Sequence, residues 1–507
     1  MTATPNASRS RLFVYGAVIF LSSAALLVLE MVAGRLLAPY IGVSLYSWTS
    51  IIGVILAGLS LGNWIGGIRA DRGADERSAA RVLVLAGLYS LGSLALLSRL
   101  AAGVVGSGAG LLASSFLLTA LLFFIPAVLL GVVTPLLTTL ALRLDDRTGH
   151  VVGRMHALAA VGSIAGTFAA GYWLIQYFGT YMVVIGTAAL LLLLALPLFR
   201  LRASRIATGT AAAAILALGA SNVLQAPCDR ESSYFCIRVA DHSADAPYGE
   251  ARGMVLDHLL HSINHREDPS LMIAPYVHAM DELLHTHFGT DYEAGLDYFF
   301  AGGGAYTQPR AVLALSPDSS VTVAELDPLV TRTAADSLYL DPSGMEIIHD
   351  DARRALLHAA GPFDVVIGDV FHDVAIPQHL VTREFFELVD ARLADGGMLA
   401  MNVVDAFPDP RLVKAVMNAL RSVFPYTAVW VDQLPDKATR VTYIITARRH
   451  GEWPERVAAR RGPPRTWYRI DEPMARTGTP FDDLPVLSDR YAPVERLIAD
   501  LLTGANR

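Results

Sequence analysis

Long runs of uncharged, apolar residues fill the first 225 of the 507 residues, and they constrain the fold more than any other feature. A helix that crosses a bilayer needs about 20 mostly apolar residues. Seven stretches meet this requirement: 12–33, 47–67, 81–99, 111–142, 155–177, 179–199 and 206–224. Only 17% of the residues are charged, where soluble domains average about 25%. The sequence therefore predicts a polytopic α-helical membrane domain of about seven helices over residues 1–226, in a multi-pass cell (inner) membrane protein.

Arginine placement predicts the orientation of these helices, because positively charged residues favour cytoplasmic loops. Arginines gather before the first stretch, between the second and third, around 143–154 and before the seventh. Seven spans that begin inside place the C-terminal half outside, where Cys228 and Cys236 could form a disulfide. A buried reduced pair is the alternative, and the side of the membrane that carries the C-terminal half stays open.

Two features of the membrane half allow a transport role. Glu30 is the only carboxylate within a predicted span, and such a group is costly unless it faces a partner or a cavity. It is either a transport or proton site or a structural partner of Arg35. Gly62, Gly66 and Gly67 lie in a segment that resembles the loop between the second and third helices of major-facilitator transporters. The same small residues also fit ordinary helix packing.

From Ser232 onward, short β-rich runs alternate with amphipathic helices. We expect one helix over 270–288 and a second helix that follows the glycines at 302–304 and ends at about Leu315. Strands are expected at 234–240, 252–257, 296–301, 321–325, 346–348, 363–369, 397–404, 426–431 and 441–446. This alternation predicts a mainly parallel, doubly wound sheet. The expected organisation is a small β-rich region at 227–290 followed by an α/β domain at 291–507.

A glycine turn gives the first indication of chemistry. Gly302, Gly303 and Gly304 follow an apolar strand and precede a helix, so backbone can approach a ligand closely there. Glu325 lies 23 residues beyond Gly302, at the end of the next predicted strand. A carboxylate at that place can bind the ribose hydroxyls of a nucleoside cofactor.

Two aspartates continue the pattern along the same edge of the predicted sheet. Asp351 follows the third strand of this domain and can accept a hydrogen bond from an adenine amino group. Asp369 closes the fourth strand, where open α/β sheets place their ligands. We therefore expect a nucleoside site at the carboxyl edge of the sheet.

These residues resemble the spermidine synthase family of polyamine aminopropyltransferases, in variants fused behind a polytopic membrane domain. The matching stretch runs from about 233 to 404 and has five anchors: Arg252–His261, Ala301–Tyr306, Val323–Asp327, Asp350–Ala352 and Ile367–Phe371. A tail motif, Leu487–Val494, is similar to the end of such fused proteins. The resemblance implies a Rossmann-like fold of methyltransferase type.

The resemblance also implies an activity, a co-substrate and residue roles. Family members transfer an aminopropyl group from decarboxylated S-adenosylmethionine to a diamine, usually putrescine, and leave methylthioadenosine. No permanently bound cofactor is expected, and a homodimer is allowed. By position, Glu325 binds ribose, Asp351 binds adenine and Asp369 is the catalytic base. His261 joins the three glycines at the cofactor site.

The amine-binding residues depart from the family pattern. Ala305 stands where the family has an acidic residue after the three glycines, so the acceptor amine stays open. His261 replaces a glutamine, and His258 replaces a glycine. The expected substrate-binding residues are Tyr276, His278, His372 and Asp373, of which His372 and Asp373 follow the catalytic aspartate.

Other partners and functions were weighed against this interpretation. A net charge of −7 gives no general attraction to nucleic acid. His258, His261 and His265 have helical spacing, but no cysteine or second ligand pair accompanies them, so no metal is expected. Two rivals remain: a methyltransferase that uses intact S-adenosylmethionine, and a noncatalytic nucleoside-binding module that gates a transporter-like membrane half.

Overall fold

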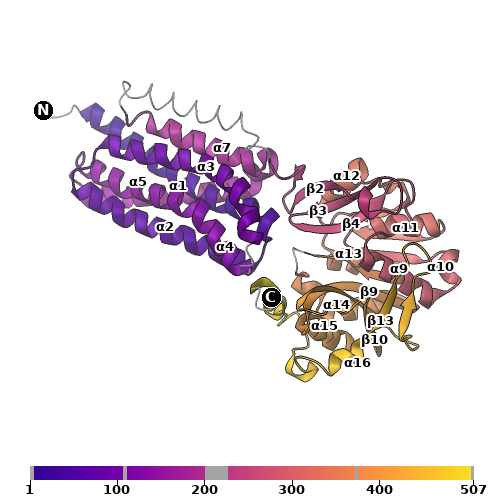
Figure 1. Ribbon diagram of the computed structural model, residues 1–507. Helices are drawn as coiled ribbons and strands as arrows, with labels where there is room; N and C mark the ends of the chain where they lie inside the picture. The colour runs from indigo at the N-terminus through magenta and orange to yellow at the C-terminus, as the bar shows by residue number, and fades with distance from the viewer. Residues whose placement is uncertain (1–4, 107–110, 200–225, 372–374, 504–507) are drawn as a thin grey trace. The chain divides into compact units, whose positions relative to one another are not determined.

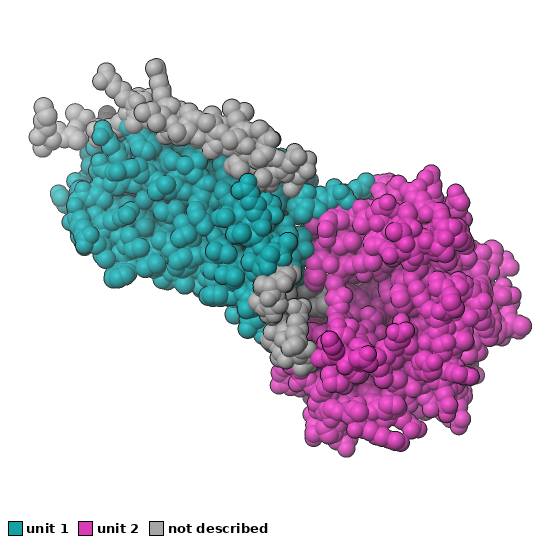
Figure 2. All heavy atoms as spheres, viewed as in Figure 1, with its two compact units in different colours: residues 1–233 teal, residues 234–507 magenta. Residues whose placement is uncertain are grey.

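The computed structural model describes residues 5–106, 111–199, 226–371 and 375–503. The chain divides into two compact units, residues 1–233 and 234–507 (Figure 2). The division falls a few residues beyond the boundary expected at 226.

The first unit is a bundle of long helices (Figure 1). Five of its described helical stretches are long and apolar enough to cross a membrane. They are α1 (Pro5–Ile41), α2 (Leu45–Asp71), α3 (Glu76–Gly106), the continuous α4 (Leu111–Thr119), η1 (Ala120–Phe124) and α5 (Ile125–Leu142), and the continuous α6 (Thr148–Ala169), η2 (Ala170–Leu174) and α7 (Ile175–Ala195). The seventh predicted span, 206–224, lies outside the described residues.

Three of the predicted spans, 111–142, 155–177 and 179–199, have features that the sequence did not predict. The helix over 111–142 is continuous, with a π-helical turn at Ala120–Phe124 directly before Pro126. A proline ring clashes with the carbonyl four residues earlier, and a wider turn relieves that clash. The predicted spans 155–177 and 179–199 are joined, with a break at Gly179, whose φ is +73°. The carboxylate of Glu231 accepts from the Thr180 backbone N–H at 2.6 Å and caps the helix after this break.

Glycines set the closest helix crossings in this unit. A Cβ on Gly62 of α2 would lie 2.2 Å from the carbonyl oxygen of Val128 on α5, and Gly66 lies one turn further along the same crossing. On α6, a Cβ on Gly162 would lie 2.1 Å from the carbonyl oxygen of Phe20. Gly62 and Gly66 therefore allow backbones to touch, as small residues do in membrane helix pairs.

Cys228 and Cys236 are disulfide-bonded. The sequence allowed either a disulfide or a reduced pair of cysteines, and the structure has the disulfide. Disulfides persist in oxidising compartments.

The second unit opens with antiparallel strands β2 (Cys236–Asp241), β3 (Ala251–Leu256) and β4 (Leu259–His265), after a two-residue strand β1 (Arg230–Glu231) at the end of the first unit. Strand β4 was not predicted. It corrects the helical spacing inferred for the histidines, because His258 lies in the β3–β4 turn while His261 and His265 lie on an extended strand.

A nine-stranded sheet forms the rest of the second unit, in the order β12-β13-β10-β11-β9-β8-β5-β6-β7. Its strands are β5 (Asp297–Ala301), β6 (Ser320–Ala324), β7 (Glu346–Ile348), β8 (Phe363–Gly368), β9 (Leu393–Phe407), β10 (Tyr426–Val431), β11 (Thr439–Arg448), β12 (Arg456–Ala458) and β13 (Thr466–Arg469). Strands β5 to β9 pair in parallel, whereas the pairs beyond β9 are antiparallel. The expectation of a mainly parallel sheet is wrong for this second half, because short connections join β10 to β11 and β12 to β13 as hairpins.

Helices cover both faces of this sheet, as in Rossmann-like methyltransferase folds (Figure 1). One face packs against α9 (Pro275–Phe288), α11 (Thr307–Leu315) and α12 (Pro328–Ser337), with Phe300 of β5 in the shared core. The next residue back, Phe299, points to the opposite face and packs against Phe363. The helices α13 (Ala352–His358), α14 (Arg383–Arg392) and α15 (Arg411–Arg421) contact the sheet from there. Shorter helices complete the unit: α10 (Asp291–Ala294), α16 (Asp471–Ala475), α17 (Val494–Leu497) and α18 (Ala499–Thr503).

Candidate active site

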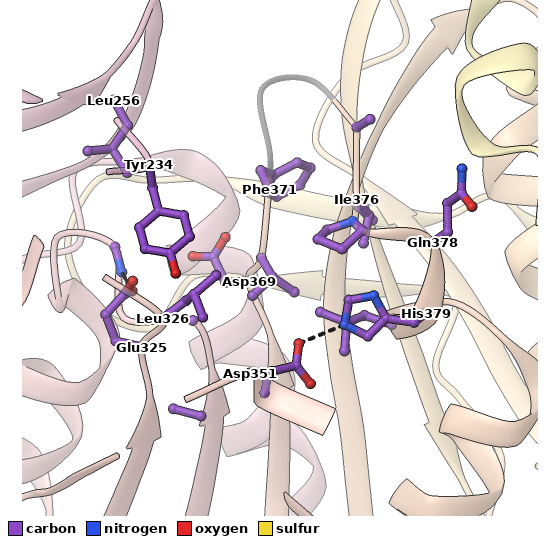
Figure 3. A pocket seen from close by; sticks show the side chains of 18 of the residues that line it. Tyr234, Leu256, Glu325, Leu326, Asp351, Asp369, Phe371, Ile376, Gln378 and His379 are labelled. Carbon is purple, nitrogen blue, oxygen red and sulfur yellow. Dashed lines mark hydrogen bonds and ion pairs between the residues drawn. The ribbon is translucent and has the colours of Figure 1, made fainter. Parts of the chain in front are cut away.

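A cavity of about 370 Å³ lies at the carboxyl ends of strands β5, β6 and β8 (Figure 3). Most of the predicted cofactor and catalytic residues line it: His261, Gly302, Gly304, Glu325, Asp351 and Asp369. They come from five separate segments of the chain. Four of these segments follow the parallel strands β5 to β8, whose carboxyl ends meet at one edge, whereas His261 comes from strand β4.

The glycine turn needs its glycines for two reasons. Gly302 has a φ of +92°, and a Cβ on it would lie 2.1 Å from the carbonyl oxygen of Asp369. Gly304 also has a positive φ, of +50°. Side chains at these positions would strain the backbone, and one at 302 would push directly against the segment that carries Asp369.

Glu325 holds this turn in place. Its Oε2 accepts from the backbone N–H groups of Gly303 at 2.9 Å and Gly304 at 3.3 Å, and its Oε1 accepts from the N–H of Asp327 at 2.9 Å. Burial raises the pKa of Glu325, while these three N–H groups favour its ionised form. A carboxylate oxygen has two lone pairs, so Oε1 keeps one acceptor position for a ligand hydroxyl.

Asp369 is half-buried in the site and held on both oxygens. The side-chain amide of Asn402 donates to its Oδ1 at 3.1 Å, and the phenol oxygen of Tyr276 lies 3.2 Å from its Oδ2. Burial raises the pKa of Asp369 to about 6, and the contacts with Asn402 and Tyr276 oppose that rise. The carboxyl therefore changes charge close to neutral pH, as a general base needs to do.

Tyr276 ties Asp369 to the neighbouring hairpin. Its hydroxyl also donates to the backbone carbonyl of His261, and a phenol has only one hydrogen to give. When that hydrogen goes to His261, a protonated Asp369 can donate to the phenol oxygen. When Asp369 is ionised, the phenol hydrogen can turn toward it. The pair accommodates both charge states of the carboxyl.

Asp351 lies at the opposite end of the cavity, at the N-cap of α13. Its Oδ1 accepts from the backbone N–H of Arg354 at 3.0 Å. Its Oδ2 lies 2.7 Å from Nε2 of His379, the contact drawn in Figure 3. The carboxylate is thus fixed by its own helix and by the loop before α14, with one acceptor position left on each oxygen.

The predicted amine-binding residues that the structure describes do not line the same cavity as the predicted cofactor-binding residues. Tyr276 lines a second cavity of about 300 Å³ with Trp430 and Trp467. His278, which the sequence predicts at the substrate, is 3% exposed and lies beside Trp467, with Nε2 3.6 Å from the Glu282 carboxylate. It lines neither cavity. The cause is the helix phase of α9, which turns position 278 away from position 276. His372 and Asp373 lie outside the described residues.

Two further features of the site concern its histidine and its alanine. Burial lowers the pKa of His261 to about 4, so its ring is neutral. Ala305, in place of the family's acidic residue, is 2% exposed and packs in the core cluster. Among the residues that the structure describes, no three His, Cys, Asp or Glu side chains come together as a metal-ligand set.

Asn402 and His379 were missed by the sequence reasoning. Asn402 is the one amide within the apolar run of β9, and it sits beside Asp369 because β9 pairs with β8. A lone polar residue in a buried strand next to the strand that ends at Asp369 is a signal that could have been used. His379 lies in a loop without any spacing pattern, so the sequence offered no comparable signal.

Comparison with known proteins finds similarity over about a quarter of the chain. A polyamine aminopropyltransferase from Vibrio vulnificus is 32% identical over 127 residues, which cover 24% of this chain and 41% of that protein. Polyamine aminopropyltransferase 2 from Pseudomonas aeruginosa is 30% identical over 137 residues, covering 25% and 39%. Over these stretches the chain is similar to polyamine aminopropyltransferases.

The likeness to these relatives is partial. The chain spans less than half the length of the curated relatives it matches. No family model matches it. A crystal structure of a probable spermidine synthase from Corynebacterium glutamicum aligns over 53% of this chain and 99% of that one, with 21% identity and a TM-score of 0.45.

Proposed function

We propose that this protein is a membrane-bound aminopropyltransferase. It would transfer an aminopropyl group from decarboxylated S-adenosylmethionine to putrescine or a related amine, and release methylthioadenosine. The observation that carries the proposal is Asp369, a half-buried carboxyl with a raised pKa of about 6 that shares one cavity with the glycine turn, Glu325 and Asp351. The kinship with polyamine aminopropyltransferases supports the same choice.

The residues divide the work along the cavity. Asp351 accepts from the amino group of adenine, and the free position on Oε1 of Glu325 accepts from a ribose hydroxyl. The backbone of the glycine turn lets the sulfonium end approach the centre of the cavity, beside Asp369. Binding both reactants in this alignment supplies much of the rate, because the reaction needs the amine in line with the breaking bond.

Asp369 prepares the nucleophile. An aliphatic amine is protonated near neutral pH and has no lone pair to offer. The Asp369 carboxylate takes one proton, and the amine nitrogen then attacks the methylene carbon next to the sulfonium. The carbon–sulfur bond breaks, its electron pair stays on sulfur, and neutral methylthioadenosine leaves. Asn402 and Tyr276 keep the accepting oxygens in position.

The membrane part of the proposal rests on the first unit, whose described residues include five helical stretches long and apolar enough to cross a bilayer. Their length and hydropathy support a multi-pass protein of the cell membrane.

Product analysis tests the proposed function. Full-length protein in detergent is offered decarboxylated or intact S-adenosylmethionine, each with a panel of mono-, di- and polyamines, and the products are weighed by mass spectrometry. We expect an aminopropylated amine with the decarboxylated donor only. A methylated product with the intact donor would favour the methyltransferase alternative, and ligand-dependent transport without turnover would favour the noncatalytic one.

A further inference from the structure

The C-terminal segment Leu487–Glu495 takes part in building the nucleoside cavity. Val494 and Glu495 line the cavity, as do Gln378 and His379. The backbone N–H of Arg383, the first residue of α14, donates to the Leu487 carbonyl at 2.9 Å and attaches this segment to the domain. The tail motif therefore has a structural place at the site.

Asp489 is the most highly connected residue of this segment. Its two carboxylate oxygens pair with both terminal nitrogens of Arg353 on α13, each at 2.7 Å. The hydroxyl of Thr382 donates to its Oδ1 at 2.8 Å, and its backbone N–H donates to Glu384 at 2.9 Å. Fork-to-fork pairing of this kind fixes geometry as well as charge. Asp489 thus joins the starts of α13 and α14.

A chain of hydrogen bonds continues from Asp489 to Asp351, the residue proposed to bind the adenine ring. Nη1 of Arg353 also donates to the backbone carbonyl of His379 at 3.2 Å. The ring of that histidine lies 2.7 Å from Oδ2 of Asp351, as Figure 3 shows. Arg353 and Asp489 are 26% and 42% exposed, and exposed ion pairs add little stability. We therefore expect this ion pair to affect the geometry of the cavity more than the stability of the fold.

We propose that Asp489 is a positioning residue for recognition of the nucleoside base. It holds Arg353, which holds the backbone at His379, whose ring sets the direction of the Asp351 carboxylate. The inference rests on the proposed function, because it takes Asp351 as the acceptor for the amino group of adenine. Without Asp489, the Asp351 carboxylate is no longer held in one orientation. The site then loses its preference for a purine with an amino group at position 6.

The test compares two nucleosides on the full-length protein. Methylthioadenosine presents an amino group to Asp351, whereas methylthioinosine presents a carbonyl oxygen. In Asp489→Asn, we expect calorimetry to show methylthioadenosine binding weakened roughly five- to twentyfold, the size of one charge-assisted hydrogen bond lost in part. Methylthioinosine affinity should change less than about twofold. Arg353→Lys should act in the same direction, because lysine cannot make the paired contact.

Asp500→Asn is the matched control. Asp500 lies in α18, a few residues beyond the segment Leu487–Glu495, and pairs with Arg411 at 2.7 Å with a similar exposure, but neither residue lines the cavity. This variant should keep the parental ratio of the two affinities. An unchanged ratio in both Asp489→Asn and Arg353→Lys, or equal losses for both nucleosides, would overturn the inference alone. A parent protein that binds neither nucleoside would refute the proposed function and the inference together.

Discussion

Replacing Asp369 with asparagine should remove the catalytic base while the shape of the site is retained. Asparagine is nearly isosteric, and its Oδ1 can still accept from Asn402. An aliphatic amine with a pKa near that of lysine, about 10.4, is neutral in roughly one molecule in a thousand at pH 7.4. If Asp369 supplies the deprotonated amine, its loss should lower kcat about a thousandfold at that pH, within the usual range for general base catalysis.

The pH profile separates this explanation from a loss of folding. Because the pKa of Asp369 is about 6, the carboxylate form is lost as the pH falls below 6. The parent rate should be flat above pH 7 and fall about tenfold per unit below 6. In Asp369→Asn the rate should instead rise with pH toward the pKa of the amine, about 10. Methylthioadenosine affinity should stay within a few fold of the parent.

The assay is initial-rate formation of methylthioadenosine from pH 5 to pH 10, with Asp364→Asn as the control. Asp364 lies on the same strand β8 but outside the cavity, where it accepts from the backbone N–H of Asp297. The control should keep the parental profile. Full activity of Asp369→Asn at pH 7.4, or an unchanged acid limb, would refute the base assignment and favour a site that only orients an already neutral amine.

Three further predictions concern neighbouring residues. Asn402→Leu removes a donor that favours the ionised form of Asp369, so the acid limb of the rate profile should move to higher pH; an unmoved limb would show that the amide does not act on the base. Glu325→Ala should weaken methylthioadenosine binding about ten- to a hundredfold by calorimetry, and unchanged affinity would remove Glu325 from the site. Gly302→Ala should abolish nucleoside binding. In the control Gly396→Ala, the glycine also has a positive φ but a Cβ would have nothing within 4 Å, so the variant should only lower the free energy of unfolding by about 1–2 kcal/mol, measured in a thermal melt. Similar losses of binding in both variants would contradict the steric argument.

The parallel half of the sheet was predictable from the sequence because its signals are local. The apolar run before Gly302 ends where β5 ends, and Glu325 and Asp369 immediately follow β6 and β8. Parallel pairing then brings these ends to one edge without further information. Strand β7 (Glu346–Ile348) was found in the same way, since it is a short apolar run between turns.

Features that depend on partners distant in the chain were not predictable. The ring of His379 reaches Asp351 only because the loop before α14 folds over α13. The histidines in and before β4 have a spacing that fits a helix, and only the pairing of β4 with β3 shows that the segment is a strand. His278 shows the converse problem: two residues from Tyr276, it follows the helix phase of α9 and packs beside Trp467 instead of facing the cavity.

The central claim is that this chain moves an aminopropyl group and that Asp369 makes the transfer possible. Its most direct test uses a decarboxylated donor labelled with ¹³C in the aminopropyl group, incubated with full-length protein and the best amine of the panel. We expect one labelled aminopropylated amine for each methylthioadenosine released, and loss of both products together in Asp369→Asn at pH 7.4. Methylthioadenosine release without label in any amine, or equal yields from the parent and the variant, would contradict it.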